Sequence, residues 1–232
     1  MEERKNKYPF KTTLEKYISE ILVIFIGISI SFFFDEWRDN RKDDEIIKKH
    51  LTVLRTNLVQ DTLNLTPQIN YGSKLVKSID KLAYFKFDSQ IIDSISFYID
   101  NAASYLDFRP NQMAYEEIRQ TAHTNLIKND SLKTLFLSYY TSTIPYCTEW
   151  CKIDETHTMT QLIPEMSIYF PVVNDSLSVV SSQEKAKNLR QKKLRNLLLT
   201  NSGFKKITIS VLFTTKKTTI NLLKKVDEEL NK

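Results

Sequence analysis

The sequence predicts an all-α protein, in which an N-terminal transmembrane helix continues into a long amphipathic helix that packs with about six further helices. Three observations lead to this prediction. The 232 residues include only 3 glycines and 6 prolines, far fewer turn residues than an all-β or α/β chain of this length needs. Residues 21–34 contain no charge. Downstream, apolar residues recur every three or four positions, as on one face of a helix.

The uncharged run 21–34, ILVIFIGISISFFF, is the feature that favours a membrane span. It is shorter than the roughly 20 residues a span needs, so a buried helix of a soluble protein is an alternative. Tyr17 and Trp37 flank it and lie about 30 Å apart along a helix, and such aromatic residues favour the two membrane interfaces. A cleaved signal peptide is a further alternative, but the Asp-Glu-Trp-Arg exit lacks a small-residue cleavage pattern. We therefore expect residues 18–37 to form one span.

Two features within this span have a functional and a simpler interpretation. Glu20 lies in the first turn of the apolar zone, where an ionisable group is either functional or a boundary carboxylate that reaches water. Val23, Gly27 and Ser31 follow one another at four-residue spacing. They form either a small-residue surface for helix pairing or a thin groove that faces lipid.

The charges around the span suggest an orientation. Residues 1–17 carry five cations, Arg4, Lys5, Lys7, Lys11 and Lys16, and the fifteen residues after the run carry as many, together with six acids. The positive-inside rule therefore gives a tie. A short basic tail before an uncleaved span is typical of a signal anchor, so we expect residues 1–17 in the cytoplasm and residues 38–232 as a periplasmic helical domain.

After the span, the helical pattern continues without glycine or proline up to Pro67, which predicts one helix from about Thr13 to Leu65. Its apolar positions form a heptad stripe, interrupted by Asp61: Ile47, Leu51, Leu54, Leu58 and Leu65. Such a stripe either pairs two chains as a coiled coil or faces the bundle of its own chain.

The rest of the chain is divided by turn and breaker signals. We expect helices that begin at Pro67, after Ser89, at Asn111, after Asp130, at Tyr146, at Lys185 and at Phe204. Loops are expected at 107–110 and 172–180, an irregular connection at 165–170, a kink or helix end at Pro145, and a break at Gly203. The alternation of Ile207, Ile209, Val211 and Phe213 also fits a strand, but no second strand is available to pair with it.

Two groups of residues resemble the patterns of a known family. The first comprises Lys16-Tyr17, 19–23, 26–28, Trp37 and 40–42, and the second comprises 115–118, 126–127, Asn129, Leu132 and 139–140. Together they resemble the Bacteroidota single-pass membrane proteins of domain-of-unknown-function family 6090, over about the first 140 residues. A glycine usual in the second pattern is replaced near Ala122 and His123. The resemblance implies a membrane-anchored helical protein of a Gram-negative envelope, and it brings no catalytic residues.

Cys147 and Cys151, with His157 six residues later, are candidate metal ligands. Zinc needs about four ligands, and no further Cys or His pair at zinc-site spacing completes the set. We therefore expect no metal. Outside the cytoplasm the two cysteines could form a disulfide, although adjacent turns of one helix strain its geometry. Two reduced, partly buried thiols are the alternative.

The remaining reactive residues do not form a recognised catalytic set. His50, His123 and His157 lie far apart in the sequence, and the neighbouring acids at 116–117 and 154–155 point about 100° apart on a helix. Three glycines could hardly form a phosphate loop. The aromatic series Tyr139, Tyr140, Tyr146 and Trp150 is typical of core packing, with an aromatic-lined ligand pocket as the alternative. We expect no cofactor and no enzymatic activity.

The net charge of +5 is spread along helix faces, and no nucleic-acid motif is present, so nucleic acid is not an expected partner. The expected function is that of a structural or interaction subunit anchored in the bacterial inner membrane. Its partners would be the lipid bilayer and either another envelope protein or further copies of the chain. The alternative is a periplasmic helical bundle that senses a ligand and acts through a signalling partner.

Overall fold

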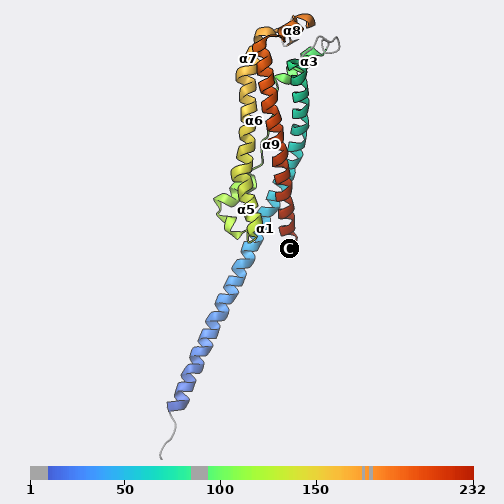
Figure 1. The fold of residues 1–232 in the computed structure, drawn as a ribbon. Helices are drawn as coiled ribbons and strands as arrows, with labels where there is room; N and C mark the ends of the chain where they lie inside the picture. The colour runs from blue at the N-terminus through green and yellow to red at the C-terminus, as the bar shows by residue number, and fades with distance from the viewer. Residues whose placement is uncertain (1–9, 85–93, 174–175, 178–179) are drawn as a thin grey trace, which may run out of the picture. The chain divides into compact units, whose positions relative to one another are not determined.

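The computed structural model describes residues 10–84, 94–173, 176–177 and 180–232, and it confirms the all-α prediction (Figure 1). The helices are α1 (Phe10–Ala83), α3 (Ile95–Ala102), α4 (Met113–Gln120), η1 (His123–Leu126), α5 (Asp130–Ser138), η2 (Tyr139–Thr143), α6 (Ile144–His157), η3 (Thr158–Leu162), α7 (Ile163–Tyr169), α8 (Ser182–Asn188) and α9 (Lys192–Leu230). Two short strands, β1 (Val172–Val173) and β2 (Ser176–Leu177), pair antiparallel within the loop predicted at 172–180. The helix start predicted after Ser89 lies outside the described residues.

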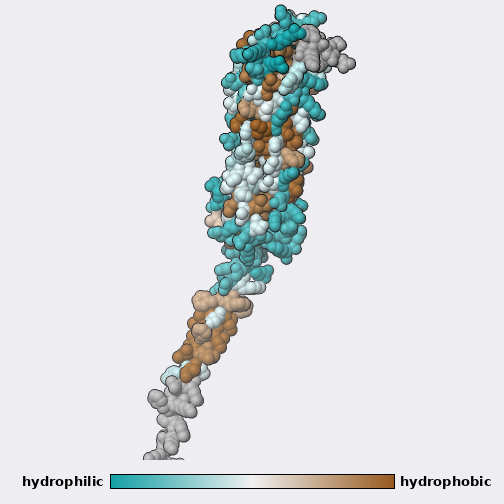
Figure 2. Space-filling model, in the orientation of Figure 1, coloured by the Kyte–Doolittle hydropathy of each residue, from teal (hydrophilic) through white to brown (hydrophobic). Residues whose placement is uncertain are grey.

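The chain divides into two compact units, Met1–Lys49 and His50–Lys232, and α1 contributes to both. In the first unit, every residue from 17 to 42 is exposed. The large apolar side chains of 21–34 are between 45% and 71% exposed, and Figure 2 shows them as a brown surface. Among the described residues, α1 is the one helix with a stretch long and apolar enough to cross a membrane, and none of that stretch is buried.

The second unit is a helical bundle. Its three longest components lie side by side in Figure 1: α1 from His50 onward, the continuous stretch from α5 to α7, and α9. The leucines of the predicted stripe, Leu51, Leu54, Leu58 and Leu65, are at most 3% exposed within this unit. The bundle of their own chain therefore covers them, which leaves these four side chains no exposed surface for pairing with a second copy.

Pro67 does not start a new helix, contrary to the sequence-based prediction, because α1 continues through it to Ala83. A proline inside a helix frees the carbonyl four residues earlier, here that of Leu63. Pro67 and Leu63 both lie on the exposed face of α1, where water reaches the freed carbonyl. The interruption is therefore tolerated without a break.

Pro145 and Pro164 likewise lie within a continuous helical stretch, which corrects the irregular connection predicted for 165–170. Each proline is the second residue of an α-helix that follows a π-helix, η2 before Pro145 and η3 before Pro164. A π-turn bonds residue i to i+5 rather than i+4. This change of hydrogen-bond pattern lies where the proline cannot donate to the α-helical ladder.

Two further boundaries differ from the prediction. The helix expected from Asn111 to Leu126 is divided into α4 and η1 by Ala122, whose φ of 57° lies in the left-handed region. The break predicted at Gly203 is absent, since α9 runs through it. One glycine costs a helix only about 1 kcal/mol, which tertiary packing readily offsets.

Gly72 marks a close approach between α1 and its neighbours. A Cβ added there would lie 2.7 Å from Ile209 Cγ1 and 2.9 Å from Leu106 Cδ1, whereas a Cβ at Gly203 would meet nothing within 4 Å. We expect Gly203→Ala to raise the free energy of unfolding by about 0.5–1 kcal/mol through helix propensity. Gly72→Ala is expected to lower it by about 1–2 kcal/mol, since the overlap outweighs the same gain. Thermal and urea unfolding of the two variants measures this contrast, and equal stabilisation by both would contradict it.

Candidate functional site

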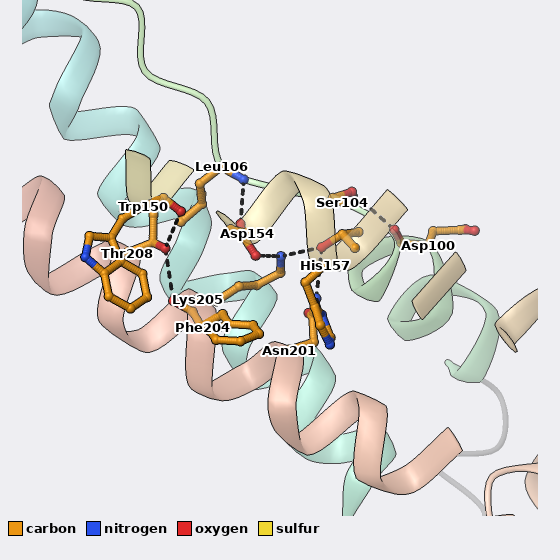
Figure 3. A network of polar contacts seen from close by, with 11 residues as sticks. Asp100, Ser104, Leu106, Trp150, Asp154, His157, Asn201, Phe204, Lys205 and Thr208 are labelled. Atoms are coloured by element: carbon orange, nitrogen blue, oxygen red, sulfur yellow. Dashed lines mark hydrogen bonds and ion pairs between the residues drawn. The ribbon is translucent and has the colours of Figure 1, made fainter. Parts of the chain in front are cut away.

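A fully buried ion pair joins Asp154 of α6 to Lys205 of α9 (Figure 3). Lys205 Nζ lies 2.6 Å from Asp154 Oδ1, and both side chains are 0% exposed. Asp154 Oδ2 accepts a hydrogen bond from the backbone N–H of Leu106 at 2.9 Å. The carboxylate therefore joins α6 to α9 and to the segment between α3 and α4.

The pair continues into a chain of polar contacts. Lys205 Nζ lies 3.4 Å from Thr158 Oγ1, which also accepts a hydrogen bond from Asn201 Nδ2 at 2.9 Å. Asn201 Nδ2 is also 3.3 Å from His157 Nδ1. Asn201 Oδ1 has no hydrogen-bond partner in the structure. Figure 3 shows the side chains of Asp154, Lys205, His157 and Asn201 gathered between α6 and α9.

The electrostatics of the network follow from its burial. Removal from water lowers the pKa of Lys205, and the charge of Asp154 opposes that shift. Burial and then the positive charge of Lys205 lower the pKa of His157, with Asp154 again opposing. We therefore expect His157 to be neutral at pH 7, with Nδ1 free to accept from the Asn201 amide.

A general acid or base must reach a bound substrate within hydrogen-bond distance. Asp154 and Lys205 have no exposed surface, so they cannot meet a substrate in this arrangement. Their hydrogen bonds instead fix the register of α9 against α6. The network is best interpreted as a structural connection, whose member nearest solvent is His157.

A second buried carboxylate, Asp61, interrupts the leucine stripe of α1. It is 0% exposed, and Oδ1 accepts the backbone N–H of Asn111 at 2.9 Å. Oδ2 has no partner, nor does the buried Asn57 Nδ2 one turn earlier. Burial raises the pKa of Asp61 to about 6, although the Asn111 bond opposes the shift. The same surroundings include Tyr139, whose hydroxyl bonds Thr219 at 3.0 Å.

Asp61 is expected to make stability depend on pH. Its carboxyl holds a proton more tightly in the folded chain than in the unfolded chain, so its contribution favours folding at low pH and is lost as pH rises from about 4 to about 6. On going from pH 4.5 to pH 7.5, the free energy of unfolding of Asp61→Asn should rise by about 1–2 kcal/mol relative to that of the wild type. Urea unfolding at both pH values measures this change, and a difference that is constant with pH would refute it.

The fold brings together two of the three histidines, which the sequence could not show. His50 Nε2 lies 2.9 Å from His123 Nδ1, and His50 Nδ1 lies 3.6 Å from Glu117 Oε1. The left-handed Ala122 directly precedes His123. His50 is buried, so this group joins α1 to the α4–η1 connection.

Cys147 and Cys151 are both buried and both free. The disulfide considered from the sequence is therefore not formed in this structure, and the alternative of two reduced thiols is the one present. Contact with the Cys147 thiol, followed by burial, raises the pKa of Cys151. The Cys151 thiol is therefore a poor nucleophile at neutral pH.

The residues predicted for the span all lie on exposed positions of α1, including Glu20, Val23 and Gly27. Ser31 donates its hydroxyl to the carbonyl of Gly27 at 2.9 Å, so this polar group is satisfied within its own helix. Tyr17 is 59% exposed and Trp37 is 52% exposed. The guanidinium of Arg41 lies 5.2 Å from the centre of the Trp37 ring.

The aromatic series is divided between core and surface. Tyr139 and Tyr140 are buried, as predicted, but Tyr146 is 54% exposed, and its ring lies edge to face with that of Trp150 at 6.4 Å. The neighbouring acids separate as expected: Glu116 pairs with Arg119, whereas Glu117 faces His50. The pairing of Asp154 with Lys205 was not predicted from the sequence. A usable signal was present, since each residue lies three or four positions from buried residues of its own helix, α6 or α9.

No group of three or more His, Cys, Asp or Glu side chains suited to a metal ion occurs within the residues that the structure describes. In comparisons with known proteins, no family model matches the chain, no curated protein is similar to it, and no solved structure is similar to it. The resemblance to family 6090 therefore stays a prediction from the quoted residues.

Proposed function

We propose that this chain is a single-pass membrane protein of a bacterial envelope, whose helical bundle holds or contacts another envelope component. One observation carries the proposal: every residue of an uncharged run of fourteen, 21–34, is exposed on a helix, while the second unit of the same chain buries a hydrophobic core. Large apolar surfaces left exposed by a folded chain mark contact with a membrane or a partner.

The surroundings of the run support lipid as the contact. Trp37 stacks with Arg41 just beyond the run, an arrangement suited to the level of lipid headgroups. Ser31 satisfies its hydroxyl internally, which lowers the cost of placing it in hydrocarbon. In the orientation we propose, residues 1–17 are cytoplasmic and the bundle is periplasmic, at the inner membrane.

The bundle itself favours an interaction role over catalysis. Its buried charged groups Asp154, Lys205 and Asp61 are enclosed and hold helices together. A reaction needs a nucleophile or base that meets substrate, and these groups do not.

The proposal is tested by topology mapping combined with purification. A phosphatase reporter that is active only in the periplasm, placed after Lys232, is expected to be active. A fluorescent protein that matures only in the cytoplasm, placed at the same position, is expected to be dark. Chemical cross-linking in intact cells, followed by detergent extraction through a C-terminal tag, is expected to give a stoichiometric partner or a homo-oligomer. A strictly monomeric chain would contradict the interaction role but not the anchoring, which the reporter measures separately.

A sensing role is the second candidate, and one observation favours it. A groove of about 620 Å³ lies between the start of α6 and the middle of α9. Its volume is within the range of small-molecule sites. As a sensor, the chain would act through a signalling partner.

A further inference from the structure

The groove between α6 and α9 differs from the rest of the bundle surface in its chemistry. Seven of its eight lining residues carry a hydroxyl group, the eighth is Val211, and none is charged. By contrast, 26% of the whole chain is charged. Figure 2 shows a pale area over α6 and α9, the colour of side chains with intermediate hydropathy.

These hydroxyl residues are unfavourable choices for a helix surface. Ser and Thr each cost a helix about 0.5 kcal/mol relative to Ala, and Lys or Glu would be favoured at exposed positions. Ser142 and Thr143 belong to η2, and Ser210, Thr214 and Thr218 belong to α9. Positions at which local preference disagrees with the structure are expected where function sets the residue.

Several of the hydroxyls are available to a ligand. In the described part of the chain, those of Ser142, Thr143, Tyr146 and Ser210 have no hydrogen-bond partner. Thr214 donates to the Ser210 carbonyl at 3.0 Å, which leaves its oxygen free to accept. The groove thus offers both donors and acceptors, and the exposed ring of Tyr146 offers an apolar face.

The lining selects the class of ligand. A phosphate or carboxylate would need a cation, and a cationic ligand would need a carboxylate, but the groove has neither. Lys217, which precedes Thr218, instead lies 4.8 Å from the centre of the Phe213 ring. A lipid chain would leave the free hydroxyls unpaired. From these contacts we infer that the groove binds a neutral polyhydroxylated ligand, a mono- or disaccharide, with one sugar face on the Tyr146 ring. This inference does not depend on membrane anchoring.

The test uses the full-length chain in lauryldimethylamine oxide, a detergent without a sugar headgroup that could compete. Glucose, N-acetylglucosamine and maltose are titrated by calorimetry and by saturation-transfer NMR, with glucuronate and glucosamine as charged analogues. We expect saturable binding of at least one neutral sugar. We also expect about tenfold weaker binding of its charged analogues and about tenfold weaker binding by Tyr146→Ala.

Two matched threonines of α9 provide the control. Thr214 and Thr200 are both exposed and both donate to the carbonyl four residues earlier at 3.0 Å, but only Thr214 lines the groove. Thr214→Val should weaken sugar binding several-fold, and Thr200→Val should leave it unchanged. The two variants should have equal melting temperatures. The inference is overturned if no neutral sugar binds saturably, if the charged analogues bind equally well, or if Thr200→Val and Thr214→Val have the same effect.

Discussion

Ile24→Arg combined with Ile28→Arg is expected to move the full-length chain from the membrane pellet to the supernatant. Both side chains lie in the middle of the apolar run and are 61% and 52% exposed, so nothing within the protein would compensate for the new charges. Each central arginine costs insertion about 2.5–3.5 kcal/mol, and two together reverse a marginal insertion by several orders of magnitude. High-speed centrifugation after carbonate extraction measures the distribution.

Ile207→Arg combined with Ile220→Arg is the matched control. These isoleucines of α9 are 42% and 46% exposed, so the control adds the same charge to the same residue type outside the run. It should pellet like the wild type. If the doubly charged 24/28 variant also stays in the carbonate-washed pellet, the apolar run is not the anchor.

Asp154→Ala should produce the largest loss of stability among single substitutions in the bundle. It leaves the Lys205 ammonium buried without its counter-charge and removes the acceptor of the Leu106 N–H. Breaking one side of a buried pair typically costs about 3–5 kcal/mol. Urea unfolding followed by circular dichroism measures the change, and the folded fraction at 37 °C should fall with it.

Glu155→Ala controls for the loss of a carboxylate at the next position of α6. Glu155 pairs with Lys152 near the surface, so we expect a change of at most about 0.5 kcal/mol. Asp154→Asn combined with Lys205→Met removes both charges and retains an acceptor for Leu106, and it should recover most of the loss. Equal effects of Asp154→Ala and Glu155→Ala would show that burial of the pair has no energetic consequence.

The helical class and most helices could be predicted because they depend on local pattern. The scarcity of glycine and the three- and four-residue spacing of apolar side chains are properties of short windows. The helix start predicted at Pro67 and the irregular connection predicted after Pro164 were wrong for a tertiary reason. A helix held along its length by neighbours tolerates a missing hydrogen bond when the freed carbonyl faces water or when a π-turn accommodates it.

The buried polar contacts could not be predicted, since they join positions far apart in the sequence. Asp154 and Lys205 lie on different helices, and His50 meets His123 only through the turn at Ala122. Asp61 was visible as an exception in the leucine stripe, but its environment depends on Asn111, fifty residues later. Predicting such a contact requires the three-dimensional fold, because the sequence contains many charged residues and does not show which of them lie opposite one another.

The two π-helices also bear on how the length of this chain could change during evolution. Each wide turn contains one residue more than an α-turn requires, and buried positions 158, 162 and 166 follow one another across η3 without leaving the same side. Loss of one residue from η2, together with alanine at Pro145, would give an ordinary helix that still turns Cys147 and Cys151 inward. A deletion between 130 and 169 that lies outside both η2 and η3 would rotate the following face by about 100°. Relatives that differ in length by one residue are therefore expected to differ at these two turns.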